Sequence, residues 1–255
     1  MIVIENLEKK FGKTVALSQV NLKISKGGCI SLIGPNASGK TTLIKTILGL
    51  VIPDKGKILI NGHPIIREWS YRKDIGYMPQ IGRYPDNMKI GQLFKMLQTI
   101  RNIPAEYLDR ELIEKFQLET IFEKPMRTLS GGTRQKVSAA LAFLFDPLVL
   151  ILDEPTAGLD PLASEILKEK ILSEKKKKKL ILITSHILSD LDEMTTHIMY
   201  LQEGKMLFLK EIETLQEETG ELRLGKAIAR IMKGEPINNQ WIDKMFEVKN
   251  DERIY

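Results

Sequence analysis

The chain has 255 residues, of which 43% are hydrophobic, and a formal net charge of +5. This length allows one large or two small domains with a sizeable core. The single cysteine, Cys29, excludes an intramolecular disulfide, and the longest apolar stretch, residues 137–152, contains Asp146 and Pro147 and is too short to cross a bilayer. A disulfide-stabilised scaffold and a membrane-spanning subunit are therefore excluded.

The N-terminal part of the chain reads as short strands interrupted by one helix. Runs typical of β-strands occupy residues 2–7, 15–24 and 29–34, and a strand with a following turn is predicted at 56–62. Residues 39–50 carry apolar side chains on one helical face, which predicts a helix there. The third strand is therefore followed almost at once by a helix.

The middle of the chain, residues 81–145, changes character. Strand signals fade, and helices are predicted at 90–100, 106–118 and 131–145. A uniformly apolar run at 148–152 then predicts a parallel strand that is buried on both faces. The middle segment is thus interpreted as a helical region placed between two parts of a sheet.

The remaining elements alternate between helix and strand, which is typical of a mostly parallel sheet covered by helices. After residue 210 the sequence predicts a C-terminal helical extension over 211–255, in which residues 221–232 form a helix. That helix packs back on the domain, reaches a partner, or is a surface helix before a loose tail. The elements predicted between 161 and 210 are a helix at 161–174, a strand at 180–184, a helix at 187–194 and a hairpin of 197–202 with 205–210.

Five consecutive lysines, Lys175 to Lys179, form a low-complexity run. Such a block is able to bind anionic lipid or nucleic acid. The preferred interpretation is a solvated turn after a helix, because cations are favoured at a helix C-terminus. Lysine and arginine are otherwise spread along the chain, so no nucleic-acid partner is expected.

The strongest chemical motif is the stretch GPNASGKT, Gly34 to Thr41, which fits the phosphate-loop pattern between a strand and a helix. Its glycines let successive N–H groups point at phosphate oxygens, and the helix N-terminus adds partial positive charge. Lys40 supplies a full charge to the phosphates and Thr41 offers a hydroxyl to Mg²⁺. A tight turn without ligand is the less favoured alternative. The predicted nucleotide-binding residues here are Gly34, Pro35, Asn36, Ala37, Ser38, Gly39, Lys40, Thr41 and Thr42.

Two carboxylates follow the apolar run at 148–152. They lie at the carboxyl edge of the sheet, where α/β proteins bind ligands. Asp153 is expected to hold Mg²⁺ through its water shell, and Glu154 to polarise the water that attacks the γ-phosphorus. A helix N-cap with an acidic first turn is the alternative, but the phosphate loop in the same chain favours the catalytic interpretation.

A second candidate anion-binding loop, LSGGT, occupies residues 129–133 within the helical region. Lys40 and Asp153 lie 113 residues apart, whereas one βαβ unit needs only about 30 residues. The segment 81–145 is therefore interpreted as an insertion. A phosphate loop with its own carboxylates does not explain why the insertion carries another glycine pair after a serine.

Six ordered motifs resemble those of the nucleotide-binding ATPase subunits of ABC transporters, and the resemblance covers roughly residues 2–210. It implies an α/β fold with a P-loop NTPase core, a mostly parallel sheet, an N-terminal antiparallel β subdomain and an inserted α-helical subdomain at about 81–145. The ABC-type ATP-binding domain is accordingly placed at residues 1–210. The motifs are GPNASGKTT (34–42), GYMPQ (76–80), LSGGT (129–133), LILDEPT (150–156), AGLD (157–160) and TSH (184–186).

The resemblance implies a role for the second loop. In this family two such domains pack head to tail around two ATP molecules, and the phosphate loop of one faces the LSGGT of the other. Ser130, Gly131 and Gly132 are then expected to close the partner's nucleotide. The expected partner is an identical chain or a related ATPase subunit.

The resemblance also carries over further site residues. Gln80 is expected to reach Mg²⁺ and the attacking water, His186 to contact the γ-phosphate, Asp160 to cross the dimer interface and Phe11 to stack on adenine. The sequence departs from the commonest family pattern in Thr133, where Gln is usual, and in Phe11, where Tyr is frequent. The expected catalytic residues are Glu154, His186, Gln80 and Lys40, the metal-binding residues are Thr41, Gln80 and Asp153, and the cofactors are ATP and Mg²⁺.

The function implied is ATP hydrolysis that drives separate integral membrane permease subunits from the cytoplasmic face of the membrane. Residues 82–92 are the candidate permease contact. Residues 77–92 and 130–147 also resemble the ATPase of nitrous-oxide reductase maturation, which serves copper or sulfur supply, although no residue here is a convincing copper ligand. The alternatives are a soluble ABC-type ATPase acting on ribosomes or DNA and, less favoured, a small-molecule kinase.

Overall fold

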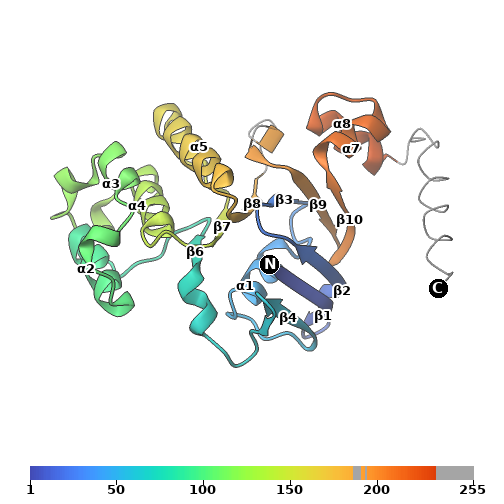
Figure 1. The fold of residues 1–255 in the computed structure, drawn as a ribbon, viewed down its shortest axis with the longest axis horizontal. Coiled ribbons are helices and arrows are strands. Elements are labelled where there is room, and N and C mark those ends of the chain that lie inside the picture. Colours follow the sequence, from blue (N-terminus) through green and yellow to red (C-terminus); the bar gives the residue numbers. More distant parts are fainter. Residues whose placement is uncertain (186–190, 193, 234–255) are drawn as a thin grey trace.

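The computed structural model describes residues 1–185, 191, 192 and 194–233. Its centre is a six-stranded sheet in the order β10-β9-β3-β8-β7-β6 (Figure 1). The neighbours β9-β3, β3-β8, β8-β7 and β7-β6 are parallel, and only β10 pairs antiparallel, with β9. The predicted mostly parallel sheet is confirmed. Its strands are β3 (Cys29–Ile33), β6 (Ile75–Met78), β7 (Val149–Asp153), β8 (Leu180–Thr184), β9 (His197–Gln202) and β10 (Lys205–Glu211).

A second sheet, of four antiparallel strands in the order β2-β1-β4-β5, confirms the predicted N-terminal β subdomain. Its buried side chains, α1 (Lys40–Ile47) and one face of the large sheet share a hydrophobic cluster that includes Ile4, Leu32 and Ile44. The helix that follows the phosphate loop is thereby held on both sides. The strands are β1 (Ile2–Phe11), β2 (Thr14–Ile24), β4 (Lys55–Ile60) and β5 (His63–Pro64).

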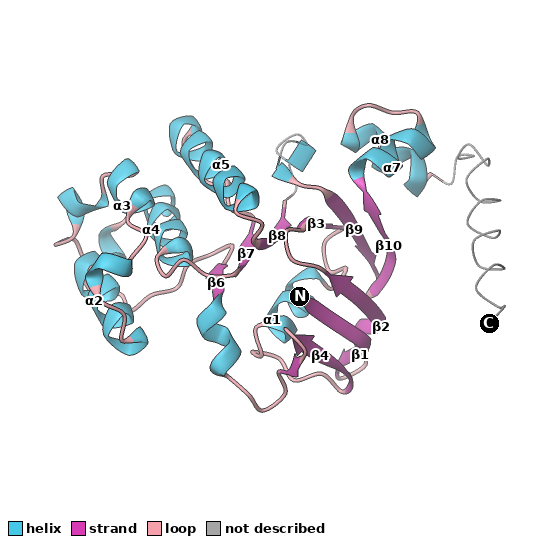
Figure 2. Cartoon of the chain, in the orientation of Figure 1, coloured by secondary structure: helices cyan, strands magenta, loops and turns pink. Residues whose placement is uncertain are grey.

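The helical insertion lies beyond the β6 end of the sheet (Figures 1 and 2). It comprises α2 (Ile90–Arg101), α3 (Glu111–Lys115) and α4 (Gly131–Phe143), with short 3-10 turns between them. The turns are Ala105–Tyr107, Leu118–Ile121 and Met126–Thr128, and a further 3-10 turn, Ser70–Asp74, precedes β6.

The single helix predicted over 106–118 is wrong. The carboxylate of Asp109 accepts a hydrogen bond from the Glu111 N–H at 3.2 Å, and α3 begins only there. Gln117 has a φ of 53°, in the left-handed region, which ends the helical path. Local side-chain and backbone preferences therefore break the segment into short pieces that periodicity alone does not reveal.

The interpretation of the lysine run as a solvated turn is wrong for its last residue. Lys179 is only 8% exposed and forms ion pairs with Asp146 and Glu174. Glu174 lies on α5 (Pro161–Lys176) and is also paired with Lys170 and Lys177. Burial raises the pKa of Glu174, but the surrounding ammonium groups outweigh it and lower the pKa to about 2. The run thus joins α5 to the segment before β7.

The C-terminal helices α7 (Ile212–Thr219) and α8 (Leu224–Met232) follow β10. Leu215, Leu224 and Ile228 belong to the same hydrophobic cluster as Ile198 and Tyr200 of β9. Of the three alternatives for residues 221–232, the structure shows the helix that packs back on the domain. Within the described part of the chain, no helix is long and apolar enough to cross a membrane.

Candidate nucleotide-binding site

The loop between β3 and α1 requires glycine at both ends. Gly34 has a φ of 150°, and a Cβ added there would lie 2.0 Å from the carbonyl oxygen of Leu201. Gly39 has a φ of 106°, and its added Cβ would lie 2.4 Å from the carbonyl oxygen of Ala16. Neither position accommodates a side chain, because backbone atoms of neighbouring strands occupy the space. The loop therefore forms a cradle that only glycine allows at these two points.

The polar groups of this loop are a lysine ammonium and a buried serine hydroxyl. Lys40 Nζ donates hydrogen bonds to the carbonyl oxygens of Gly34 and Pro35 at 2.7 and 2.9 Å, so its charge lies over the loop. Burial lowers the pKa of Lys40, while Glu154 and Asp153 oppose that shift. The Ser38 hydroxyl is buried and has no hydrogen-bond partner within the described residues. A cradle with one ammonium and one unpartnered hydroxyl fits a phosphate group.

The carboxylates at the end of β7 are tied to β8. Thr184 Oγ1 donates to Asp153 Oδ1 at 2.5 Å and accepts a hydrogen bond from the Glu154 N–H at 3.0 Å. Burial raises the pKa of Asp153, with Glu154 raising it further and the Thr184 hydrogen bond and Lys40 opposing the rise. Burial, and to a lesser degree the charge of Asp153, raises the pKa of Tyr77 to about 12. Glu154 itself has a φ of 52°, which is uncommon for a residue other than glycine.

One cavity of about 310 Å³ brings the predicted phosphate-loop residues 36–42 together with the predicted metal residues, whereas Gly34 and Pro35 do not line it. Thr41, Gln80 and Asp153 offer hydroxyl, amide and carboxylate oxygens, the donors that Mg²⁺ prefers. Glu154 lies in the same wall. These residues therefore fit a magnesium–nucleotide complex. The cavity is lined by Thr14, Val15, Ala16, Asn36, Ala37, Ser38, Gly39, Lys40, Thr41, Thr42, Gln80, Asp153 and Glu154.

Thr14, Val15 and Ala16 line this site although no sequence motif includes them. They begin β2, and Thr14 pairs with Phe11 across the β1–β2 hairpin. Phe11 is 51% exposed at the hairpin end, beneath Lys9 Nζ at 5.4 Å from its ring centre, and it does not line the cavity itself. The sequence signal that could have indicated these residues is the turn after Phe11, because a tight turn places the start of β2 beside Phe11.

The LSGGT loop lies elsewhere. Ser130 caps α4 by accepting a hydrogen bond from the Thr133 N–H at 3.2 Å, and the two hydroxyl oxygens are 2.9 Å apart. A Cβ added at Gly131 would meet no atom within 4 Å, so this position is open. The cavity beside the phosphate loop includes neither Ser130 nor Gly131 nor Gly132 in its lining. The LSGGT loop therefore lies outside the cavity of the phosphate loop.

Asp160 links the second loop to α5. Its carboxylate caps α5 by accepting a hydrogen bond from the Ala163 N–H at 2.9 Å, and it forms an ion pair with Lys136 of α4 at 2.7 Å. The hydrogen bond from Lys136 holds the pKa of Asp160 below its usual value. Gly132 lies close to the carbonyl oxygen of Gly158. The N-terminal parts of α4 and α5 thus contact each other. His186, the remaining predicted site residue, lies outside the described residues.

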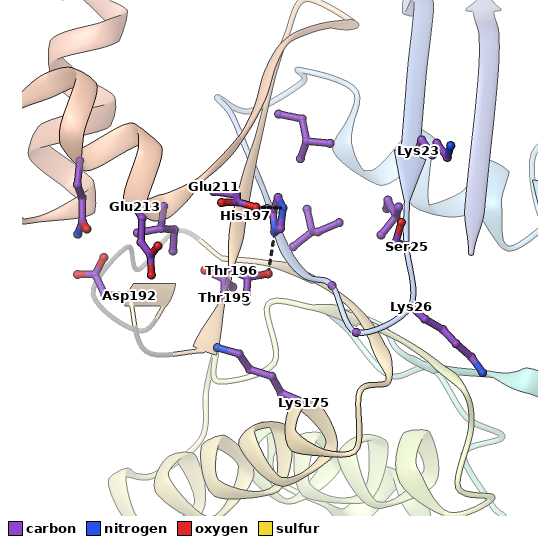
Figure 3. A pocket seen from close by; sticks show the side chains of 17 residues that line it. Lys23, Ser25, Lys26, Lys175, Asp192, Thr195, Thr196, His197, Glu211 and Glu213 are labelled. Atoms are coloured by element: carbon purple, nitrogen blue, oxygen red, sulfur yellow. Dashed lines mark hydrogen bonds and ion pairs between the residues drawn. The ribbon is translucent and has the colours of Figure 1, made fainter. Parts of the chain in front are cut away.

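A larger cavity, of about 730 Å³, lies at the opposite edge of the sheet (Figure 3). It is bordered by the starts of β3 and β9, by β10 and by α7, and none of the predicted site residues lines it. His197 Nε2 lies 3.5 Å from Glu211 Oε1, and its Nδ1 is 2.8 Å from the Thr196 hydroxyl, which agrees with a structural histidine. Ligands of α/β sheets bind at the carboxyl ends of parallel strands, so the smaller cavity is the candidate site.

Three carboxylates, of Asp109, Asp146 and Glu174, lie close enough together to hold a metal ion. Lys170 and Lys179 already place ammonium groups among them. The group is therefore an ion-pair network that joins α5 to the helical insertion, and we assign no metal to it.

Comparison with known proteins agrees with this geometry. Residues 17–157 match the family model described as ABC transporter. The lantibiotic transport ATP-binding protein SrtF of Streptococcus pyogenes is 37% identical over 216 residues, which cover 84% of this chain and 92% of the relative. A Nod factor export ATP-binding protein I of Burkholderia lata is 32% identical over 206 residues, which cover 79% of this chain and 68% of the relative.

Among solved structures, one described as an ATP-binding subunit of an ABC transporter matches with a TM-score of 0.83 at 28% identity. The match covers 91% of this chain and 99% of the other. The family match extends over more than half of the chain and includes the phosphate loop, the LSGGT loop and both carboxylates. The chain belongs to the ABC transporter family, in which it is an ATP-binding ATPase subunit.

Proposed function

We propose that the chain hydrolyses ATP as a head-to-tail dimer, with an identical copy or a related subunit, and drives separate membrane subunits. The observation that carries this proposal is the separation of its two anion-binding loops. The phosphate loop lines a cavity with Asp153 and Glu154, whereas the LSGGT loop lies outside that cavity with an open glycine. In a head-to-tail dimer, the phosphate loop of one chain and the LSGGT loop of the other bind the same nucleotide.

The cavity residues have distinct roles in hydrolysis. Backbone N–H groups of the loop and Lys40 bind the phosphates, and Glu154 orients the attacking water and accepts its proton. Thr41, Gln80 and Asp153 hold Mg²⁺, which when bound neutralises charge that develops on the phosphate oxygens. Lys40, now hydrogen-bonded to two loop carbonyls, exchanges those acceptors for phosphate oxygens. The roles of His186 at the γ-phosphate and of Phe11 at the adenine stay predictions.

The partner's LSGGT completes the site. The Ser130 hydroxyl, the N–H groups of Gly131 and Gly132 and the start of α4 together present an anion site. Ser130 Oγ accepts the Thr133 N–H, and when it also accepts the Thr133 hydroxyl its own proton is left for a phosphate oxygen. Asp160 lies on the same surface through Lys136 and reaches the dimer interface. Closure then depends on the γ-phosphate, which makes ATP the switch.

The proposed permease contact is a second cavity of about 310 Å³ between β6 and the helical insertion. Tyr84, within residues 82–92, lines it and donates to or accepts from the Ser138 hydroxyl of α4 at 2.7 Å. A partner segment in this cavity contacts α4 and the segment after Gln80 together. We place the chain, through this contact, at the cytoplasmic face of the membrane. The lining includes Tyr77, Pro79, Arg83, Leu97, Arg101 and Phe145.

The name of one relative, the Nod factor export protein, suggests export as the direction of transport. Another relative is named for lantibiotic transport. The narrower hypothesis, maturation of nitrous-oxide reductase with copper or sulfur as cargo, is supported by residues 77–92 and 130–147 alone. Co-purification from detergent-solubilised native membranes decides between these cargoes through the identity of the membrane subunit. Ribosomes or DNA-bound proteins in the eluate, without a membrane protein, would instead establish the soluble alternative.

The dimer is tested by placing a carboxylate on the open glycine. Gly131→Asp fits the chain's own fold, because its Cβ meets no atom and Asp is favoured in the first turn of a helix. We expect this variant to bind ATP at its own phosphate loop but to lose ATP-dependent dimerisation, because like charges meet across the interface. The measurements are light scattering with ATP and Mg²⁺ and the fluorescence of a bound ATP analogue, both in a Glu154→Gln background.

Gly131→Ala is the matched control, since it adds a methyl group without charge. A Gly131→Asp chain that still dimerises with ATP would contradict the head-to-tail arrangement. Loss of both dimerisation and nucleotide binding would indicate that LSGGT serves its own chain's nucleotide.

A further inference from the structure

Thr184 is the last residue of β8, between the strand that carries the phosphate loop and the strand that carries the carboxylates. In register it faces Leu32 of β3 on one side and Asp153 of β7 on the other. The residue is 1% exposed and does not line the nucleotide cavity. Whatever it contributes to the site is therefore exerted through its neighbours.

The single hydroxyl of Thr184 serves both acidic residues. Its proton goes to Asp153 Oδ1 at 2.5 Å, and its oxygen accepts the Glu154 N–H at 3.0 Å. The Thr184 carbonyl oxygen accepts the same N–H at 3.1 Å. The first bond fixes the rotation of the Asp153 carboxylate. The second anchors the backbone of Glu154, whose φ of 52° needs such support.

We propose that Thr184 is a positioning residue of the hydrolysis site, which orients the Asp153 carboxylate toward the cation and the Glu154 side chain toward the attacking water. This inference rests on the proposed roles of Asp153 and Glu154. By engaging Oδ1, the hydroxyl assigns Oδ2 to the hydrated cation. One side chain thereby couples the placement of the cation to the placement of the base.

The decisive variant is Thr184→Val, which keeps the shape of the side chain and removes the hydroxyl. We expect the affinity for Mn²⁺, used as a paramagnetic probe in the presence of ATP, to fall about 10- to 100-fold, as for other residues that orient metal ligands. Binding of a fluorescent ATP analogue without a divalent cation should be unchanged, because the phosphate loop is intact. Thr184→Ser should restore Mn²⁺ affinity and hydrolysis.

Thr219→Val is the matched control. Thr219 is also a buried threonine, 2% exposed, and its hydroxyl donates to the Leu215 carbonyl oxygen far from the cavity. We expect this control to keep Mn²⁺ affinity even where it lowers the melting temperature. If Thr184→Val fails to fold, Thr184→Ala is measured in its place with the same readouts.

Two results would overturn the inference. One is a folded Thr184→Val or Thr184→Ala chain with wild-type Mn²⁺ affinity, and the other is a Thr184→Ser chain as impaired as Thr184→Val. Asp153→Ala separates these from failure of the proposed function. If Asp153→Ala leaves Mn²⁺ affinity unchanged, the metal role of Asp153 is wrong, and the role of Thr184 falls with it. If Asp153→Ala lowers the Mn²⁺ affinity and Thr184→Val does not, only the role of Thr184 is wrong.

Discussion

The two anion-binding loops of this chain differ in how they are built. The phosphate loop is embedded, and its glycines are surrounded by backbone atoms of Leu201 and Ala16 from two other strands. The LSGGT loop is open, with nothing within 4 Å of a Cβ added at Gly131. The chain's own fold requires glycine at Gly34 and Gly39, whereas it leaves open space at Gly131.

This difference shows that the two loops are suited to different binding tasks. The backbone shape of an embedded loop is set during folding, which lowers the entropy cost of binding phosphate later. An open loop at a helix start keeps its N–H groups and its Ser130 hydroxyl accessible to a second molecule. The comparison therefore predicts that substitutions in the two loops have separable effects on folding, on nucleotide binding and on turnover.

The largest expected effect is on turnover and concerns Glu154, which lies in the cavity of the embedded phosphate loop. Glu154→Gln keeps the shape of the side chain but removes the base, so we expect hydrolysis to fall about 10²–10⁴-fold while ATP binding persists. Phosphate release and binding of a fluorescent ATP analogue measure the two quantities. Glu203→Gln is the matched control, because Glu203 is exposed and also has a positive φ, of 49°. Equal turnover in Glu154→Gln and the wild type would remove Glu154 from the catalytic role.

The next effect compares one glycine from each loop. Gly39→Ala places a Cβ 2.4 Å from a backbone oxygen at a φ of 106°, so we expect loss of nucleotide binding and a free energy of unfolding lower by about 1–3 kcal/mol. Gly131→Ala should leave that free energy within about 0.5 kcal/mol of the wild type. Denaturant titration and ATP binding are the measurements. If the two substitutions lowered the free energy of unfolding equally, the description of one loop as embedded and the other as open would be wrong.

The smallest effect concerns the cap of α4. Ser130→Ala removes the oxygen that accepts the Thr133 N–H, and we expect a loss of about 1 kcal/mol in the free energy of unfolding. Turnover should fall as well, because the γ-phosphate of the nucleotide bound by the partner loses a hydrogen-bond donor. ATP binding by the isolated chain should persist. Thr133→Val is the control, since it removes a hydroxyl but retains the capped N–H. Full turnover in Ser130→Ala would show that Ser130 only caps its own helix.

Much of the fold followed from local sequence patterns. The strand, loop and helix around Gly34 and Lys40 were predicted because the motif and its flanking apolar residues agree on one local structure. The parallel strand before Asp153 was predicted for the same reason. The helix over 106–118 was predicted wrongly, because Asp109 and Gln117 interrupt a periodic pattern through their own hydrogen bond and backbone conformation.

Other features depend on residues far apart in the chain. The burial of Lys179 required Asp146 and Glu174, and no pattern within the lysine run indicates either partner. The place of Thr14 to Ala16 in the nucleotide cavity depends on how the β1–β2 hairpin lies against the phosphate loop. The link between Thr184 and both carboxylates depends on the register of β8 against β7.

The sequence by itself determined which chemical groups are present and in what order: a phosphate loop, an LSGGT loop and an acidic pair, each encoded within a few consecutive residues. Only the tertiary structure decided which of these groups share a cavity. It placed Lys40, Gln80, Asp153 and Glu154 together and left Ser130 and Gly131 on another surface. The physical reason is that motif identity resides in local backbone geometry, whereas proximity is set by strand order and by the packing of distant apolar faces.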